Sequence, residues 1–242
     1  MPSGIDEEAR KAADAPLRAM AYETLRRRLV TGAITPDQVL SSRALARELG
    51  VSPMPVREAV SRLAAEQALE VRSKSSIVVP QMTPQRFDDL LFSRMQLEPA
   101  AAMRAMPEVT QTLIAELSDI DQRMNRGLAS GDVEAYMLGN YEFHFKIYAA
   151  KPGPTVMRLI ETLWLQFGPL MRLVFERYAG RPAEEDQHPV ILEALRDGDA
   201  ARLGEAVAAD IMDGMRLVQV SMKLSCDDRR KAGEITAISD SR

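Results

Sequence analysis

A very short junction between two helical segments constrains this fold more than any other feature of the sequence. Ser42 can cap a helix that carries Leu45 and Leu49 at helical spacing, and Gly50 can end that helix. Ser52 can cap the next helix, and Pro53 suits its first position. Only two residues then lie between one helix and the cap of the next, which is the spacing of a helix-turn-helix. The second helix of such a pair can enter the major groove of DNA.

The segments on either side of this junction predict a small complete unit. Leu17, Met20, Leu25 and Leu29 give an earlier helix a partly apolar face, which ends near residues 31–32. After the third helix, residues 69–72 and 77–79 form two short runs rich in β-branched side chains, and these predict a hairpin. We therefore expect a winged helix-turn-helix over residues 16–80, preceded by a flexible leader over residues 1–15.

The charge distribution separates this unit from the rest of the chain. The 31 basic and 35 acidic residues give a formal net charge of −4, which argues against a protein that coats nucleic acid nonspecifically. Residues 9–80 nevertheless hold 12 basic residues against 7 acidic ones. The candidates for phosphate contacts are Arg43, Arg57, Arg62, Arg72 and Lys74, with the hydroxyl of Ser52. The alternative is that these side chains belong to solvated helix faces.

From Pro80 onward, apolar residues recur at helical spacing and the breaks between segments are clear. The pattern predicts six helices, bounded near residues 83–106, 107–130, 132–149, 155–178, 182–196 and 199–224, with a kink at 168–169. Thr83 and Asp132 can cap the first and third of these helices, and Gly131 can end the second. We expect an antiparallel all-α bundle over residues 81–224. Residues 225–242 are polar and without period, and they predict a disordered tail.

The remaining composition limits where such a chain works. The single cysteine, Cys226, cannot form a disulfide within the chain, and the first residues lack the features of a signal peptide. No apolar run approaches the roughly 20 residues that a membrane-spanning helix needs. We expect a cytoplasmic protein without a membrane span.

Polar residues interrupt the apolar stripes of the predicted bundle. Asn140 and His144 lie one turn apart on such a stripe, and His188 and Asp210 occupy equivalent places on later helices. Buried polar groups need partners, and a divalent cation would satisfy imidazole, carboxylate and amide oxygen together. These ligand types suit Zn, Mn, Fe or Ni alike. The alternative is a hydrogen-bonded polar cluster without metal.

Two arginines of the second half are candidates for an anionic ligand. The guanidinium of Arg94 can bind a carboxylate in bidentate fashion, and Arg172 is a weaker candidate. The alternative for Arg94 is an i,i+4 ion pair with Glu98.

The first half resembles the winged helix-turn-helix of the GntR family of bacterial transcription regulators. The resemblance covers about residues 17–79, and the segment GVSPMPVREAVSRL (residues 50–63) carries its most specific part. It implies that Arg43, Ser52 and Arg57 contact DNA, and we include Pro53 and Met54 of the same helix start. Pro53 replaces the usual arginine of the family. Gln67 and Ser75 replace its usual glycines.

The second half resembles the FCD ligand-binding domain of FadR-type GntR regulators over about residues 84–222. The resemblance rests on RMQLE at residues 94–98, NYEFH at 140–144, and His188 followed by ILEALRDGD. It implies a metal held by one aspartate and three histidines, with a small carboxylate beside it. His144 and His188 match two of the histidines. Asn140 replaces the aspartate, and Asp210 replaces the third histidine.

These features together predict a homodimeric repressor that reads an imperfect palindrome in double-stranded DNA and responds to a small carboxylate effector. One alternative is a regulator with a metal-free effector pocket. Another is a metal-dependent enzyme on a helical bundle, although the sequence shows no separate general base. A third is a structural DNA-binding dimer whose bundle only dimerises.

Overall fold

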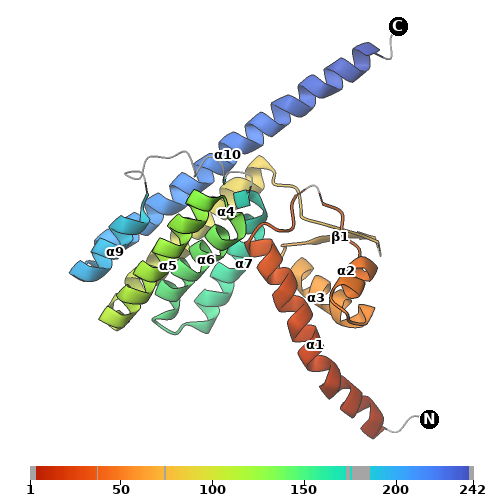
Figure 1. The fold of residues 1–242 in the computed structure, drawn as a ribbon, viewed down its shortest axis with the longest axis horizontal. Helices are drawn as coiled ribbons and strands as arrows, with labels where there is room; N and C mark the ends of the chain where they lie inside the picture. The colour runs from red at the N-terminus through yellow and green to blue at the C-terminus, as the bar shows by residue number, and fades with distance from the viewer. Residues whose placement is uncertain (1–3, 37, 74, 173–174, 176–185, 240–242) are drawn as a thin grey trace.

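The computed structural model describes residues 4–36, 38–73, 75–172, 175 and 186–239, and it describes side chains between residues 15 and 220. It is mainly helical and has two parts, which we call the head (residues 4–79) and the bundle (residues 84–239), as Figure 1 shows. The head contains α1 (Gly4–Val30), α2 (Ser42–Glu48), α3 (Pro53–Ala65), β1 (Glu70–Ser73) and β2 (Ser76–Val78). The bundle contains α4 (Pro84–Ala105), the 3-10 turn η1 (Met106–Glu108), α5 (Gln111–Ser130), α6 (Val133–Ala149), α7 (Pro154–Met171), α9 (His188–Asp197) and α10 (Ala200–Ser239).

The head is a winged helix-turn-helix, as the sequence predicts. Gly50 ends α2 with a positive φ of 66°, a conformation that glycine adopts without strain, and α3 begins three residues later. The wing is an antiparallel pair in which Val71 faces Ile77, and Leu40 adds a bridge to the same strand. The apolar sides of α1, α2, α3 and the wing enclose one core, which includes Leu25, Leu29 and Leu63.

The helix caps follow the sequence prediction with one correction. Thr83 and Asp132 accept hydrogen bonds from backbone amides at the starts of α4 and α6, and Gly131 ends α5 with a φ of 74°. The predicted cap of α2, Ser42, was wrong. Ser41 has the extended backbone of a cap and accepts from the amide of Ala44, whereas Ser42 is buried within the first turn.

The bundle buries a second apolar core between α4, α5, α6, α7, α9 and α10. Its largest fully buried side chains include Trp164, Tyr148 and Phe143. In Figure 1 the head lies at one side of the bundle, beside α7, while α10 extends past the other helices. Leu165 of α7 packs in the core of the head, so α7 belongs to both parts.

Three segments differ from the predicted boundaries. Helix α1 begins at Gly4, within the predicted leader, and α10 continues to Ser239, through the predicted disordered tail. Both segments lack apolar periodicity but are rich in charged residues, and the first also contains several alanines, which favour helix. Helix α5 begins at Gln111 and not at Pro107, because Thr110 supplies its cap. The predicted helix boundaries between residues 176 and 185 lie outside the described residues.

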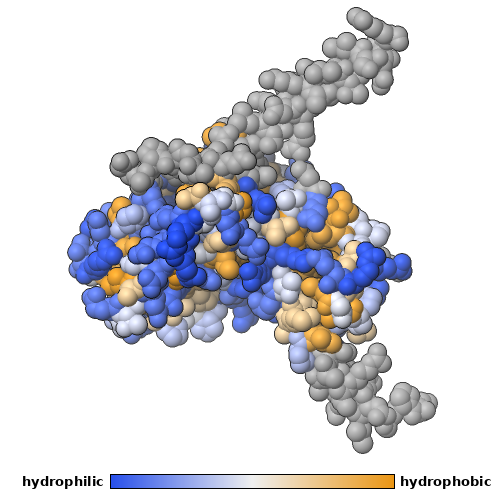
Figure 2. Space-filling view, in the orientation of Figure 1, coloured by the Kyte–Doolittle hydropathy of each residue, from blue (hydrophilic) through white to orange (hydrophobic). Residues whose placement is uncertain are grey.

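Among the described residues, no helix is long and apolar enough to cross a membrane. Figure 2 shows hydrophilic side chains over much of the face that it draws, with apolar ones in small separate groups.

Candidate functional site

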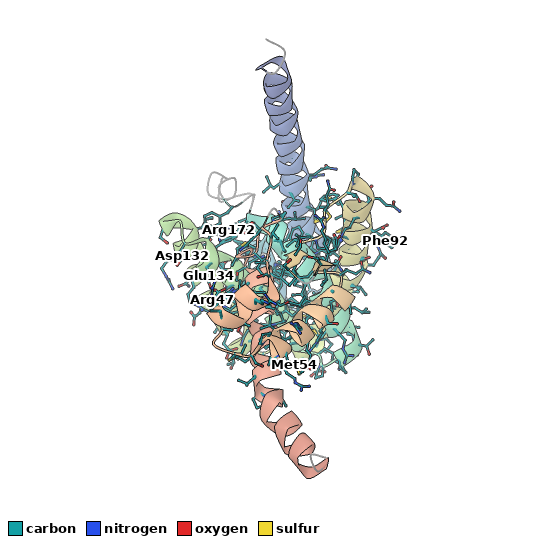
Figure 3. All side chains as sticks on the ribbon, turned by 90° about the vertical axis from the view of Figure 1, so that its right-hand side faces the viewer. Arg47, Met54, Phe92, Asp132, Glu134 and Arg172 are labelled. Carbon is teal, nitrogen blue, oxygen red and sulfur yellow. The ribbon has the colours of Figure 1, made fainter. Side chains whose placement is uncertain are left out.

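Helices α2 and α3 present arginines that are not engaged with other parts of the protein. Arg43 and Arg57 are exposed, and neither makes an ion pair with any described residue. Arg47, labelled in Figure 3, is also exposed and without an ion pair in the described part of the chain. Other arginines of the head are paired, since Arg62 contacts Glu66 and Arg28 contacts Glu48. The unpaired arginines are thus available for phosphate or base contacts.

The start of α3 exposes the polar and apolar groups expected of a DNA-reading helix. Ser52 occupies the cap position, but its hydroxyl makes no capping hydrogen bond and remains exposed. Pro53 is exposed at the first helical position, and Met54, labelled in Figure 3, has an exposed fraction of 52%. The hydroxyl and the free amides of this helix end are donors suited to phosphate.

Of the two predicted DNA-contact residues of the wing, the structure describes one. Arg72 is exposed on β1 and forms an ion pair with Glu70 at 3.1 Å. Lys74 lies outside the described residues. Gln67, just before the wing, has a φ of 59°. Glycine adopts this left-handed conformation without strain, which explains why the GntR pattern has glycine at this position.

The bundle brings the predicted metal ligands together. We call Asn140, His144, His188 and Asp210 the histidine cluster. They come from α6, α9 and α10, and one ligand atom from each of His144, His188 and Asp210 lies within 4.8 Å of the others. Both histidines are buried, and Asp210 is partly buried. Asn140 is buried one turn before His144 and makes no hydrogen bond with the described residues.

The neighbours of His144 fix which ring nitrogen carries its proton. Tyr148 donates its hydroxyl proton to Oε2 of Glu98 at 3.0 Å, and its oxygen lies 3.3 Å from Nδ1 of His144. Because the hydroxyl has a single proton, Nδ1 of His144 must be the donor in the second contact. The neutral ring then has a lone pair on Nε2, which lies 3.1 Å from Oδ2 of Asp210 but out of line for a hydrogen bond.

The neighbours of His188 have the same effect on its ring. Nδ1 of His188 lies 3.5 Å from Oδ1 of Asp121 and 3.4 Å from Oδ1 of Asp186, so this nitrogen is the protonated one. Nε2 is buried and has no hydrogen-bond partner among the described residues. Burial alone would lower the pKa of His188, but its contacts with Asp121, Asp210 and Asp186 raise it to about 9.

Two imidazole rings and a carboxylate thus lie together in the interior. Because its pKa is raised to about 9, the His188 ring carries a second proton at neutral pH, and a bound metal ion would take the place of that proton on Nε2. Groups that only accept hydrogen bonds repel each other there unless a proton or a metal cation lies between them. Burial alone would raise the pKa of Asp210, but the interaction with His144 and the charges of His188 and Arg94 lower it to about 2. Asp210 is therefore ionised at neutral pH, which is the form that binds a cation. The residues therefore fit a divalent ion bound by two histidines and one carboxylate.

Arg94 lies beside this cluster but is already paired. Its Nε donates to Oε1 of Glu98 at 2.6 Å, and its guanidinium lies 4.3 Å from the ring centre of Phe167 and 5.0 Å from that of Trp164. The i,i+4 pair with Glu98 is therefore formed. The Nη1 group of Arg94 is nevertheless buried and unpartnered in the described part of the chain. Arg172 is exposed at the end of α7 next to Gly32, so the structure does not bring it to Arg94.

The sequence analysis missed several members of this site. Asp121 lies on the buried stripe of α5 between Leu117 and Met124, so the reasoning that identified Asp210 would have found it. Asp186 precedes α9 and follows no stripe that could have identified it. The contact between Tyr148 and Glu98 joins α6 to α4 and depends on tertiary packing alone.

Comparisons with known proteins match both parts of the chain. The family described as "Bacterial regulatory proteins, gntR family" matches residues 17–79, and the family described as "FCD domain" matches residues 89–212. The HTH-type transcriptional regulator McbR of Escherichia coli K12 is 32% identical over 179 residues, which cover 72% of this chain and 80% of that protein. The gluconate operon transcriptional repressor of Bacillus subtilis 168 is 25% identical over 203 residues, which cover 80% and 81%.

Solved structures agree with these matches. The structure of E. coli McbR/YncC superposes with a TM-score of 0.78 at 28% identity, and the match covers 85% of this chain and 98% of that one. A putative GntR transcriptional regulator from Rhodococcus sp. RHA1 has the same fold, with a TM-score of 0.70 at 17% identity and coverage of 85% and 98%. The chain belongs to the GntR family of bacterial regulatory proteins and is a DNA-binding transcription regulator of the FadR type, with an FCD effector-binding domain.

Proposed function

We propose that this regulator is a homodimeric repressor in the cytoplasm, and that a small organic acid bound beside a divalent metal ion weakens its hold on the operator. The observation that carries the effector part is the cluster of the buried His144 and His188 with Asp210, in which each residue offers one ligand atom within 4.8 Å of the others. This arrangement supports a binding role for the histidine cluster.

The residues that would hold the ion are His144, His188 and Asp210, with the side-chain oxygen of Asn140 as a weaker fourth ligand. Three strong ligands leave coordination positions open, and a bound ion would supply Lewis-acid attraction for a chelating carboxylate. Arg94 supports an anionic effector, because its Nη1 group is a buried donor without a partner in the described structure. Glu98 balances its charge until such a ligand arrives.

Helix α7 connects the effector site to the recognition helix α3. Nε1 of Trp164 donates to Oε2 of Glu98 at 2.9 Å, so α7 contacts the partner of Arg94 in the proposed effector site. Two residues later, Nε2 of Gln166 donates to the carbonyl of Glu66 at 3.3 Å, where α3 ends. Arg86 strengthens this contact, since it donates to Oε1 of Gln166 at 2.9 Å and to the carbonyl of Gln67 at 2.5 Å.

A shift of α7 would therefore reach α3 through direct contacts. An effector that draws Arg94 away from Glu98 would alter the packing of Trp164 and with it the position of Gln166. The two DNA-reading heads of a dimer would then no longer match the spacing of two half-sites. Because the coupling is reciprocal, operator DNA would also weaken effector binding.

The homodimer is supported by the symmetry that operators of helix-turn-helix proteins require. An exposed aromatic side chain on the bundle is consistent with a dimer, because Phe92 of α4, labelled in Figure 3, is 67% exposed. Sedimentation of the full chain would test the dimer, and a monomer at micromolar concentration would contradict it.

The effector proposal is tested with an operator selected from random duplex DNA by the wild-type protein. Fluorescence anisotropy at fixed salt would measure operator affinity while organic acids are screened. At least one acid should lower the affinity of the wild type. His144→Ala and His188→Ala should retain operator binding and lose that response. An unchanged response in both variants would contradict the assignment of the pocket.

A further inference from the structure

We propose that Asp121 is a positioning carboxylate that holds His188 with its Nε2 lone pair directed toward the metal ion. This inference rests on the proposed metal function of the histidine cluster. Asp121 contacts the distal nitrogen of the ring and would act on the ion only through His188.

The surroundings of Asp121 leave one oxygen for this role. Oδ2 accepts a hydrogen bond from Nδ2 of Asn125 at 3.3 Å. Oδ1 is buried, has no hydrogen-bond partner among the described residues, and lies 3.5 Å from Nδ1 of His188. A buried carboxylate oxygen without a partner is costly, and a shift of a few tenths of an ångström would complete its bond with the ring.

Asp186 contributes less because it is already engaged. Its Oδ1 accepts from the backbone amide of His188 at 3.1 Å, and its side chain is 32% exposed, against 12% for Asp121. Contact with Asp186 thus secures the start of α9, whereas Asp121 reaches the ring from α5. Phe143 packs on His188 with ring centres 4.6 Å apart and limits its rotation.

A carboxylate at this position determines which nitrogen of the imidazole ring can bind an ion. A neutral imidazole carries one proton, and a carboxylate at Nδ1 keeps that proton on Nδ1. Nε2 is then unprotonated and faces His144 and Asp210. Partners of this kind fix the orientation and basicity of ligating histidines, and their removal typically costs about 10- to 100-fold in metal affinity.

One other arrangement uses the same residues. Asp121, Asp186 and His188 themselves present ligand atoms within 4.8 Å of one another. An ion there would require Nδ1 of His188 to lose its proton, which the positioning role forbids. The number of ions per chain therefore separates the two arrangements.

The test is a competition titration of the full chain with Zn²⁺ and a chromophoric chelator at one pH. Asp121→Ala should lower Zn²⁺ affinity by about 10- to 100-fold. Asp121→Asn keeps an acceptor without the charge and should restore part of the loss. Asp119→Asn, an exposed change on the same helix, should leave the affinity unchanged. Thermal unfolding of the zinc-free proteins checks that each variant is folded.

A spectroscopic readout makes the positioning role specific. Histidine ¹⁵N–¹H correlation spectra of the zinc-loaded wild type should show His188 protonated at Nδ1 and coordinated through Nε2. The opposite tautomer would overturn the proposal, even if Asp121→Ala failed to fold.

The affinity results also separate this inference from the proposed function. A wild type that binds no Zn²⁺ would overturn both. One Zn²⁺ per chain bound equally tightly by the wild type and Asp121→Ala would overturn only the role of Asp121. Two Zn²⁺ per chain in the wild type, reduced to one in Asp121→Ala, would make Asp121 a ligand and would also overturn it.

Discussion

A Cβ atom at Gly168 would lie 2.5 Å from the carbonyl oxygen of Leu29, so α7 and α1 meet backbone against backbone. No side chain fits between the head and the bundle at this point. The contact lies one turn beyond Trp164, which bonds to Glu98 in the effector site. Pro169, at the predicted kink, lies inside α7, which continues to Met171. The glycine before it allows the close approach of the two helices.

The first prediction follows from this contact. Gly168→Ala should destabilise the protein by about 1–3 kcal/mol, because the added methyl group meets rigid backbone. Urea unfolding would measure the change. Leu159→Ala, which shortens a half-exposed side chain of the same helix, should cost much less. Equal stability of Gly168→Ala and the wild type would show that the head is not held against α7 in this way.

The second prediction concerns the unpaired arginines of the head. Arg57→Ala should weaken operator binding and lower the slope of log affinity against log salt by about 1 if the side chain contacts a phosphate. Arg43→Ala should behave similarly. Arg126→Ala, an exposed arginine of α5 without an ion pair in the described structure, serves as the control. Affinity and slope unchanged in Arg57→Ala would remove this residue from the interface.

The third prediction uses two serines at helix starts. Ser41 caps α2 through a 3.2 Å hydrogen bond, so Ser41→Ala should cost about 1 kcal/mol of stability. Ser52 makes no such bond, and Ser52→Ala should leave stability within about 0.5 kcal/mol of the wild type. It should instead reduce operator affinity. The reverse pattern, with Ser52→Ala unstable and fully active, would indicate a structural role for that hydroxyl.

The fourth prediction concerns the buried ion pair of Arg94 and Glu98. Glu98→Gln removes the charge that balances a fully buried guanidinium and should cost about 3–5 kcal/mol. Glu142→Gln breaks the exposed pair with Arg123 and should cost no more than about 1 kcal/mol. Chemical denaturation of both variants provides the comparison. Similar small losses in the two would mean that Arg94 finds another partner when Glu98 is neutral.

Local patterns predicted much of this structure because their causes are local. The stop at Gly50, the cap at Asp132 and the polar interruptions of the apolar stripes depend on a few neighbouring residues, and the structure places them as expected. The caps at Ser41 and Ser42 could not be separated in this way, since either serine suits the position and only the backbone conformation decides.

The remaining features depend on contacts between distant segments. Gln166 meets the end of α3 one hundred residues away, and Tyr148 meets Glu98 across fifty. The spacing of these residues in the sequence does not predict that they are in contact. The position of Arg172 is another such case, because its residue type suits an anion site while the fold places it, exposed, beside the buried Gly32.

The most direct test of the effector site is the metal content of untagged, extensively desalted protein, measured by elemental analysis. We expect about one divalent ion per chain in the wild type and its loss in His144→Ala. Absence of metal from the wild type, even after incubation with Zn²⁺ or Mn²⁺, would contradict the account and leave the histidine cluster as a hydrogen-bonding site alone.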